Sequence, residues 1–325
     1  MICESVLMDG YRPVDPRESP RFSGIKTFMR LPHVKTTEGV DFAIVGVPFD
    51  TGASFRVGAR FGPEAIRNVS ALLRHHNEVL DVSIFDHLSG VDYGDLAVNP
   101  GYIEDSYRMI EEGLLPVLEG GVVPIMLGGD HSVTLPILRA VAKKHGPLAL
   151  IHFDSHSDTG DKRFGRKYTH GTPFRRAVEE GLVRVERSIQ VGMRGSTYSR
   201  DSLDDARALG FDLVTSVEGQ EMGVENMIKR IRERVGDGEA FVSFDIDFVD
   251  PAFAPGTGTP EVGGFTSSET LRLVRGLEGL NLVAFDLVEV LPQYDPSQIT
   301  ALLAANIVYE FVSLVALKKK TLSKE

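Results

Sequence analysis

Leu148-Ala149-Leu150-Ile151-His152-Phe153-Asp154-Ser155-His156-Ser157-Asp158 begins as a buried-strand pattern and ends as a group of metal-ligand side chains. Asp154, His156 and Asp158 follow one another at intervals of two residues. Because side chains of an extended backbone alternate between its two faces, these three would project from one face. Two carboxylates and an imidazole on one side of a strand end can close around a metal ion. The stretch therefore predicts a metal site at the carboxyl end of a buried strand.

Apolar strand patterns alternate with helical patterns along most of the chain. The expected strands lie at 42–47, 91–94, 122–127, 148–153, 189–192, 212–215, 240–244 and 282–285. A helix opens at Pro63, and further helices are expected at 102–118, 135–144, 173–181, 203–209, 225–235, 267–275 and 299–317. Continuously apolar strands separated by helices indicate a mostly parallel sheet with helices on both faces. We therefore expect an α/β fold with a doubly wound sheet of about eight strands. A closed (β/α)₈ barrel is the alternative, disfavoured by uneven strand spacing and a long crossover at 48–90.

The domain organisation follows from where regular patterns begin. Residues 1–40 contain Pro13, Pro16, Pro20 and Pro32, which interrupt regular structure. We expect an N-terminal arm there, with apolar side chains to bury against the body or a neighbouring subunit: Phe22, Ile25, Phe28, Met29 and Leu31. Residues 41–325 show no linker or repeat and are expected to form a single domain.

Composition narrows the classes of partner. The net charge of −11 argues against a nucleic-acid binder, which normally presents a basic face. No uninterrupted apolar run reaches the roughly 18 residues of a membrane span, and the N-terminus lacks a secretory signal pattern. Cys3 is the only cysteine, so an internal disulfide framework and a thiolate metal cluster are excluded. We expect a cytoplasmic protein without nucleic-acid or membrane partners.

Three further motifs place polar side chains just after expected strands, at the edge where parallel sheets bind ligands. Gly128-Gly129-Asp130-His131-Ser132 follows the strand at 122–127, and Ser243-Phe244-Asp245-Ile246-Asp247 ends the strand at 240–244. Glu289 follows the strand at 282–285. His152 shares a strand face with Asp154, and we interpret it as a supporting or core histidine.

The ligand-type residues number six: His131, Asp154, His156, Asp158, Asp245 and Asp247. Zinc takes four ligands, so six are too many for one zinc ion. Two ions that share bridging carboxylates need about this number, and an oxygen-rich set suits Mn²⁺ better than zinc or copper. Such a pair lowers the pKa of a water molecule towards neutrality. The sequence therefore predicts two Mn²⁺ ions per chain.

These motifs resemble the ureohydrolase family, which includes arginase, agmatinase, guanidinobutyrase and proclavaminate amidinohydrolase. The resemblance extends to Pro48-Phe49-Asp50-Thr51-Gly52, Ala59-Arg60-Phe61-Gly62-Pro63 and His170-Gly171-Thr172-Pro173-Phe174. It implies a three-layer arginase-like fold, hydrolysis of a guanidino compound to urea and an amine, and a homotrimer or homohexamer.

The resemblance also implies residue roles. One ion would be held by His131, Asp154, Asp158 and Asp245, and the other by Asp154, His156, Asp245 and Asp247. His170 resembles the family's proton shuttle, and Glu289 resembles the carboxylate that pairs with the guanidinium group. The chain departs from the usual pattern at Ser155, where relatives usually have alanine, and at Leu291-Pro292-Gln293-Tyr294-Asp295.

The substrate is the least determined feature. The loop 159–169 lacks the asparagine that arginase sequences place there. The segments His170–Glu180 and Gly256–Gly264 resemble agmatinases and their guanidino-acid relatives, which implies agmatine as the substrate, with putrescine and urea as products. A guanidino acid such as guanidinobutyrate is the close alternative, because Lys162, Arg163, Arg166 and Lys167 could favour a carboxylate. A zinc-dependent deacetylase on the same fold would need a His-His pair in the cleft, and His75-His76 lies far from the strand ends. A non-catalytic metal-binding protein would have lost a ligand or His170, and none is missing.

Overall fold

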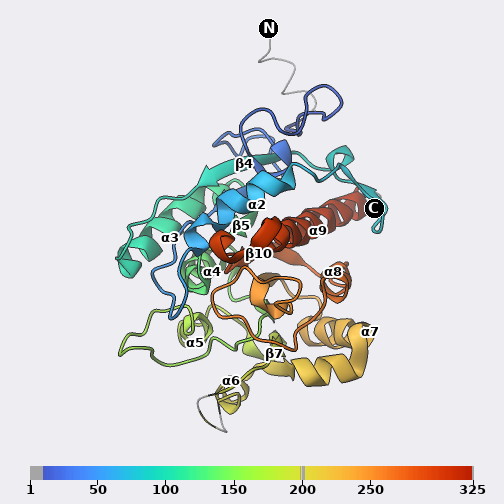
Figure 1. Cartoon of the computed structure of the whole chain (residues 1–325). Helices are drawn as coiled ribbons and strands as arrows, with labels where there is room; N and C mark the ends of the chain where they lie inside the picture. Colours follow the sequence, from blue (N-terminus) through green and yellow to red (C-terminus); the bar gives the residue numbers. More distant parts are fainter. Residues whose placement is uncertain (1–9, 198, 200–201, 324–325) are drawn as a thin grey trace.

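The computed structural model describes residues 10–197, 199 and 202–323, and a parallel sheet forms its centre (Figure 1). Among these residues eight strands pair in the order β4-β1-β5-β10-β9-β6-β7-β8, every neighbouring pair parallel. Their bounds are β1 Phe42–Gly46, β4 Gly90–Asp95, β5 Val123–Leu127, β6 Ala149–Phe153, β7 Ile189–Met193, β8 Asp212–Thr215, β9 Ala240–Asp245 and β10 Leu282–Val288. The sheet is open at β4 and β8, which confirms the doubly wound prediction over the barrel.

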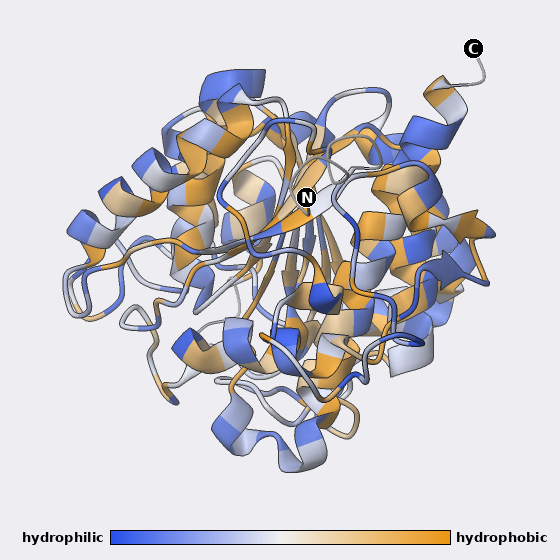
Figure 2. Cartoon of the chain, turned by 90° about the horizontal axis from the view of Figure 1, so that it is seen from above, coloured by the Kyte–Doolittle hydropathy of each residue, from blue (hydrophilic) through white to orange (hydrophobic). Residues whose placement is uncertain are grey.

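Helices cover both faces of the sheet and complete three layers. They are α2 Gly62–Ser70, α3 Ile103–Glu119, α4 Thr134–His145, α5 Pro173–Glu179, α6 Asp204–Ala208, α7 Ser216–Val235, α8 Ser267–Arg275 and α9 Ile299–Leu322. One apolar core lies beneath α2, α7, α8 and α9, and a second lies beneath α3, α4 and α5. Figure 2 shows the strands in the middle of the molecule between helices that turn hydrophobic residues inward.

The structure differs from the expected elements in two places. Helix α7 begins at Ser216, before the expected start at 225, because Thr215 forms a capping box with Glu218. Gly223, with φ of 77°, then interrupts this helix, which hides its length from the helical pattern. The crossover at 48–90 contains a small hairpin, β2 (His76–Asn77) and β3 (Val82–Ser83), that the sequence pattern missed.

The C-terminal helix is a core element despite its composition. The segment Pro296–Leu322 is long and apolar enough, by length and mean composition, to cross a membrane, although polar residues such as Asn306 and Glu310 interrupt its apolar runs. However, 83% of its most apolar window is buried inside the protein. Phe311 of α9 stacks on Phe285 of β10 at 4.7 Å between ring centroids. Burial against the sheet explains the apolar composition of this helix.

The N-terminal arm is only partly packed. Phe28, Met29 and Leu31 are buried, as expected, whereas Phe22 and Ile25 are exposed. Residues 1–9, including Cys3, lie outside the described part of the chain.

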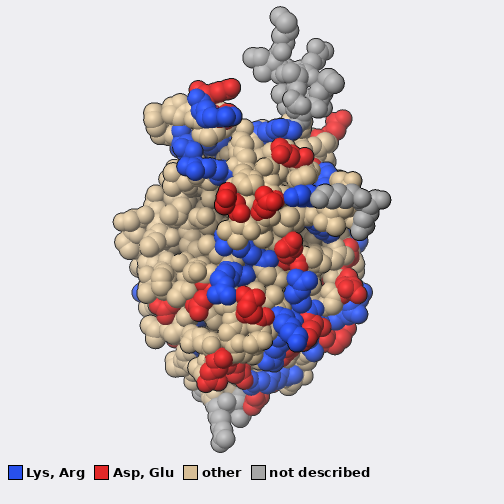
Figure 3. Space-filling view, turned by 90° about the vertical axis from the view of Figure 1, so that its right-hand side faces the viewer, with Lys and Arg blue, Asp and Glu red and all other residues tan. Residues whose placement is uncertain are grey.

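Charged side chains of both signs are intermixed on the face shown in Figure 3. Some of the exposed charges pair across elements; for example, Arg272 of α8 lies 2.8 Å from Glu225 of α7. Exposed pairs of this kind contribute at most about 1 kcal/mol each, so the sheet and its two apolar cores determine the fold.

The strand order creates the site. Strands β10 and β9 are inserted between β5 and β6, although β5 and β6 are consecutive strands of the large sheet in the chain. This break in the order is a topological switch point, where α/β sheets bind ligands. The carboxyl ends of β5, β10, β9 and β6 therefore lie side by side. The residues that follow or end these four strands are His131, Glu289, Asp245 and Asp154.

Candidate active site

His131 lies in a 3₁₀ turn (His131–Val133) directly after β5. The turn is reached through Gly129, where a Cβ atom would lie 1.7 Å from the carbonyl oxygen of Phe49, so only glycine fits. The ring atom Nε2 lies 2.9 Å from Ser243 Oγ, and this hydroxyl donates to Asp286 Oδ1 at 2.8 Å. Because the single hydroxyl proton is used for Asp286, His131 Nε2 is the donor to Ser243. His131 Nδ1 is left with a lone pair for a ligand.

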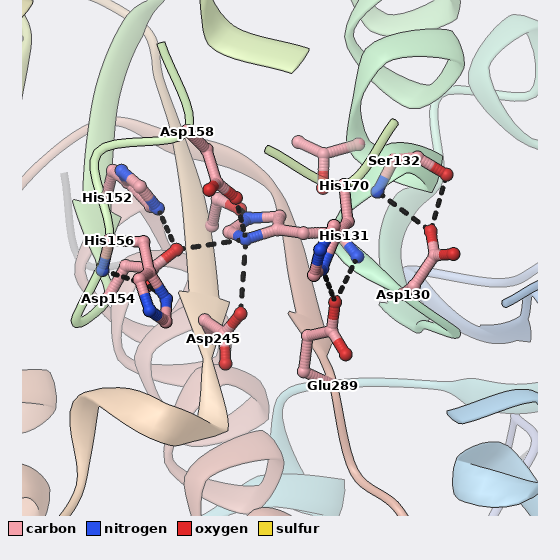
Figure 4. Close-up of polar contacts among 12 residues, drawn as sticks. Asp130, His131, Ser132, His152, Asp154, His156, Asp158, His170, Asp245 and Glu289 are labelled. Carbon is pink, nitrogen blue, oxygen red and sulfur yellow. Dashed lines mark hydrogen bonds and ion pairs between the residues drawn. The ribbon is translucent and has the colours of Figure 1, made fainter. Parts of the chain in front are cut away.

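Three carboxylates surround this nitrogen (Figure 4). His131 Nδ1 lies 3.0 Å from Asp154 Oδ2, 3.0 Å from Asp158 Oδ2 and 3.3 Å from Asp245 Oδ2. Nevertheless it is a buried atom without a hydrogen-bond partner among the described residues. An unsatisfied nitrogen among three carboxylate oxygens is the arrangement expected of a cation site.

A second position adjoins the first. His156 Nδ1 lies 3.1 Å from Asp247 Oδ2 and 3.5 Å from Asp154 Oδ1. Asp247 Oδ2 is likewise buried without a hydrogen-bond partner in the described part of the chain. Asp154 faces the first position with Oδ2 and the second with Oδ1, as a bridging carboxylate would.

The electrostatics of the cluster favour positive charge within it. Burial raises the pKa of Asp245 well above its usual value, and the nearby carboxylates of Asp247 and Asp154 raise it further. Burial and Asp154 likewise raise the pKa of Asp247. Carboxylates crowded in this way stay ionised together only when a cation compensates them. The buried oxygen and imidazole donors, with one unsatisfied atom at each position, fit two divalent ions.

The six predicted ligand residues are brought together, but not by the expected backbone geometry. Strand β6 ends at Phe153, and Asp158 adopts a left-handed conformation with φ of 50°. Asp247 belongs to the 3₁₀ turn Ile246–Phe248 instead of extending β9. The prediction that extended, alternating residues place these groups on one face was therefore wrong. Turns direct the ligand side chains towards one another instead. The hydrogen bond from Asp247 N to Asp245 Oδ1 (2.8 Å) helps to fix one of these turns.

His170 and Glu289 lie beside the cluster and contact each other. Glu289 Oε1 accepts hydrogen bonds from the backbone N–H of His131 and from His170 Nδ1, each at 3.0 Å. Glu289 itself has a left-handed backbone with φ of 64°, a conformation that costs energy and often occurs at functional positions. Burial alone lowers the pKa of His170, but the hydrogen bond and charge of Glu289 raise it to about 9.

Ser54 occupies the other side of the His170 ring and was not predicted from the sequence. Its backbone N–H lies 3.1 Å and its hydroxyl 2.7 Å from His170 Nε2. The backbone N–H donates to a neutral ring, whereas the protonated ring would direct Nε2–H to the exposed hydroxyl. Ser54 is 116 residues from His170 in sequence, so no local pattern could have identified it.

Two further sets of contacts support the site, one at Asp154 and one in the loop around His170. Gln190 Nε2 donates to His152 Nδ1 at 3.0 Å, which leaves His152 Nε2–H to donate to Asp154 Oδ2 at 2.8 Å. His152 therefore supports Asp154, as the sequence suggested.

Asp130 accepts a hydrogen bond from Gly52 N at 2.7 Å. Burial and the charge of Glu289 raise the pKa of Asp130 to about 7. Gly52 O in turn accepts from His170 N at 3.0 Å, so Asp130 helps to position the loop around His170.

The pair His75-His76 lies outside this cluster. His76 belongs to the β2–β3 hairpin, and the His75 ring packs edge-on against Phe85 at 5.1 Å. The placement gives no support to the alternative of a deacetylase with a His-His pair in its cleft.

Residues 40–313 match the arginase family. The chain is 45% identical to a guanidinobutyrase of Pseudomonas aeruginosa, over 94% of this chain and 97% of that protein. It is 47% identical to a mitochondrial agmatinase of Gallus gallus, over 90% of this chain and 86% of that protein. The solved structure of proclavaminate amidinohydrolase from Streptomyces clavuligerus superposes with a TM-score of 0.89 at 45% identity, over 92% of this chain and 99% of that chain.

The fold and the site thus define a metal-dependent hydrolase that acts on guanidino compounds. The chain belongs to the arginase family.

Proposed function

We propose that this protein hydrolyses the guanidino group of a linear guanidino carboxylic acid, releasing urea and an amino acid. The observation that supports this substrate class is the position of Arg163. Of the four cations in the loop 159–169, Lys162, Arg166 and Lys167 are exposed, whereas Arg163 is partly buried. Arg163 Nε and Asp158 Oδ1 lie 3.6 and 4.0 Å from the point that a Cβ atom on Gly171 would occupy. This cation therefore flanks the metal-ligand cluster and suits the far carboxylate of the substrate.

The loop geometry explains why Arg163 turns inward. Arg163 and Arg166 exchange backbone hydrogen bonds of 3.0 and 2.8 Å across a tight turn. Phe164 and Gly165 at its tip both have positive φ, of 50° and 73°. A cavity of about 800 Å³ lies against this turn and is also lined by Thr51, Gly52 and Ala53. The space can accommodate the tail of a linear substrate.

The residues of this chain have distinct tasks in the reaction. Glu289 Oε1 is occupied by His131 and His170, so Oε2 is the oxygen that pairs with the guanidinium group. Gly258 leaves the space in front of Glu289 Oε2 open, because a Cβ atom at this position would lie only 3.2 Å from that oxygen. His170 carries a proton on Nε2 in its charged form and delivers it to the departing amine, which leaves only when protonated. The exposed Ser54 hydroxyl connects that nitrogen with solvent.

The proposed cofactor is a pair of Mn²⁺ ions, because the donor set is rich in carboxylate oxygen. His131, Asp154, Asp158 and Asp245 would hold one ion, and Asp154, His156, Asp245 and Asp247 the other. When bound, such a pair lowers the pKa of a water molecule so that it can act as a nucleophile near neutral pH.

Agmatine is the second candidate substrate. The identity with an agmatinase supports it, and so do Glu104 and Asp105, two acids on the wall of the same cavity that could pair with its amine. The two substrates differ in the charge at the far end, so Arg163 distinguishes them.

Urea release should be measured with Mn²⁺ and each of 4-guanidinobutyrate, 3-guanidinopropionate, agmatine and arginine. We expect a guanidino acid to have the highest kcat/KM. Arg163→Ala should lower that value about 10- to 100-fold, equivalent to losing a hydrogen bond between charged groups. Lys162→Ala, which removes an exposed cation of the same loop that is not among the residues lining the cavity, is the matched control and should change it little. A wild-type preference for agmatine, or equal effects of the two substitutions, would contradict the guanidino-acid assignment.

A further inference from the structure

Ser155 lies between two of the metal-ligand residues and contacts a third. It is 1% exposed, and its hydroxyl donates to Asp247 Oδ1 at 2.8 Å. Its backbone N–H donates to the same oxygen at 3.0 Å. A carboxylate oxygen has two lone pairs, so Ser155 fills both acceptor positions of Oδ1. Only Oδ2, the atom without a hydrogen-bond partner among the described residues, is left for a cation.

The same hydroxyl also lies 3.1 Å from His156 Nδ1. A serine hydroxyl has one proton and can donate it to one of these neighbours at a time. When His156 Nδ1 gives its lone pair to a metal ion, the hydroxyl has no competing acceptor there. The hydroxyl would therefore continue to donate its hydrogen bond to Asp247 Oδ1 with a metal ion bound.

The hydroxyl is not needed to orient Asp247. The backbone N–H of Ser155 already holds Oδ1, and it would remain in an alanine variant. Asp247 also lies in the 3₁₀ turn Ile246–Phe248, where its own N–H donates to Asp245. The distinct effect of the hydroxyl is therefore to occupy a lone pair that a cation could otherwise use.

We propose that Ser155 is a positioning residue that restricts Asp247 to one metal-binding oxygen and so weakens the His156–Asp247 position for its divalent ion. An oxygen with two donors attracts a cation less, because its electron density is shared with those donors. Removing one donor would leave Oδ1 a buried, incompletely paired acceptor in the metal-free protein, and a bound divalent ion would compensate this oxygen more strongly. This inference depends on the proposed dimetal centre but not on the proposed substrate.

The test is a titration of metal-free protein with Mn²⁺. Binding is measured by calorimetry and by the electron paramagnetic resonance signal of bound Mn²⁺. Ser155→Ala should leave one of the two binding constants unchanged and tighten the other about tenfold, the equivalent of one hydrogen bond. Ser157→Ala is the matched control, because this hydroxyl in the same loop contacts Thr159 Oγ1 at 3.0 Å and no ligand residue in the hydrogen bonds described. It should leave both constants unchanged. A merely structural role for Ser155 would alter the melting temperature of the metal-free protein without separating the two constants.

Two results would overturn the proposal. Weaker binding of the second ion by Ser155→Ala would show that the hydroxyl holds Asp247 in place. Unchanged constants, or equal shifts in both serine variants, would show that it does not control this position. Urea release is measured separately: the predicted metal shift in a protein without guanidino hydrolase activity would support this inference while overturning the proposed function. A wild-type chain that binds no Mn²⁺ would overturn both.

Discussion

Glu289 Oε1 accepts a hydrogen bond of 3.0 Å from the backbone N–H of His131, which joins the expected guanidinium-binding carboxylate to an expected metal ligand. The two residues follow β10 and β5, which pair directly in the sheet. The distance between the Glu289 carboxylate and the candidate metal cluster is therefore set by two neighbouring strands, not by a flexible loop.

Replacing Glu289 with glutamine should lower kcat/KM by about 100-fold, because the guanidinium group loses a charged partner. The glutamine carbonyl can still accept from His131 N–H, so metal content should not change. Steady-state urea release and metal analysis of the purified variant test both statements. A loss of metal together with activity would mean that Glu289 acts mainly through His131.

Gly258→Ala should raise KM more than it lowers kcat. The added Cβ would lie 3.2 Å from Glu289 Oε2 and would narrow the approach of the guanidinium group. The backbone of Gly258 does not lie in the left-handed region, so the variant should fold. Kinetics and a melting curve separate the two effects. An unchanged KM would argue that the guanidinium group does not bind at Oε2.

Ser54→Ala should lower kcat about tenfold while KM stays constant, because His170 Nε2 loses its hydroxyl connection to solvent. The effect should be visible in the pH profile of kcat. If the variant and the wild type have the same kcat and pH profile, the proton follows another route.

The raised pKa of His170 predicts a pH-dependent contribution to stability. Burial lowers this pKa, but Glu289 raises it to about 9, above the ordinary value of 6.5. The folded state therefore binds the proton more tightly than the unfolded state. This contribution is complete below about pH 6.5 and is lost as the pH rises through 9, with a slope of at most about 1.4 kcal/mol per pH unit. Urea denaturation of metal-free wild type and His170→Asn between pH 6 and 10 measures it. A stability difference that does not shrink with pH would contradict the assignment.

His152→Asn should weaken Mn²⁺ binding about 10- to 100-fold, because it removes the donor that holds Asp154 Oδ2. His145→Asn provides the control, since His145 lies at the end of α4 and contacts Glu239 at 3.1 Å. Calorimetric Mn²⁺ titrations of both variants are the measurement. Equal affinities in the two variants would leave His152 with a packing role only.

The sequence by itself determined the local features of this protein. Continuous apolar segments specified the eight buried strands, because a parallel strand covered on both faces must be apolar along its length. The closely spaced groups Asp154–Asp158 and Asp245–Asp247 identified candidate metal-ligand residues, because such side chains have few other reasons to gather after a buried strand. The resemblance to the ureohydrolases then connected His170 and Glu289 to them.

Only the tertiary structure decided how these residues meet. The insertion of β9 and β10 between β5 and β6 brings His131, Asp245 and Glu289 to one edge, and strand order depends on long-range pairing that no local pattern contains. The turns after Phe153 and Asp245 replaced the expected extended geometry, because the ligand residues hydrogen-bond backbone N–H groups there. The contacts of Ser54 with His170 and of Ser155 with Asp247 likewise appear only in three dimensions. Each joins segments that are adjacent in space but separate in the chain.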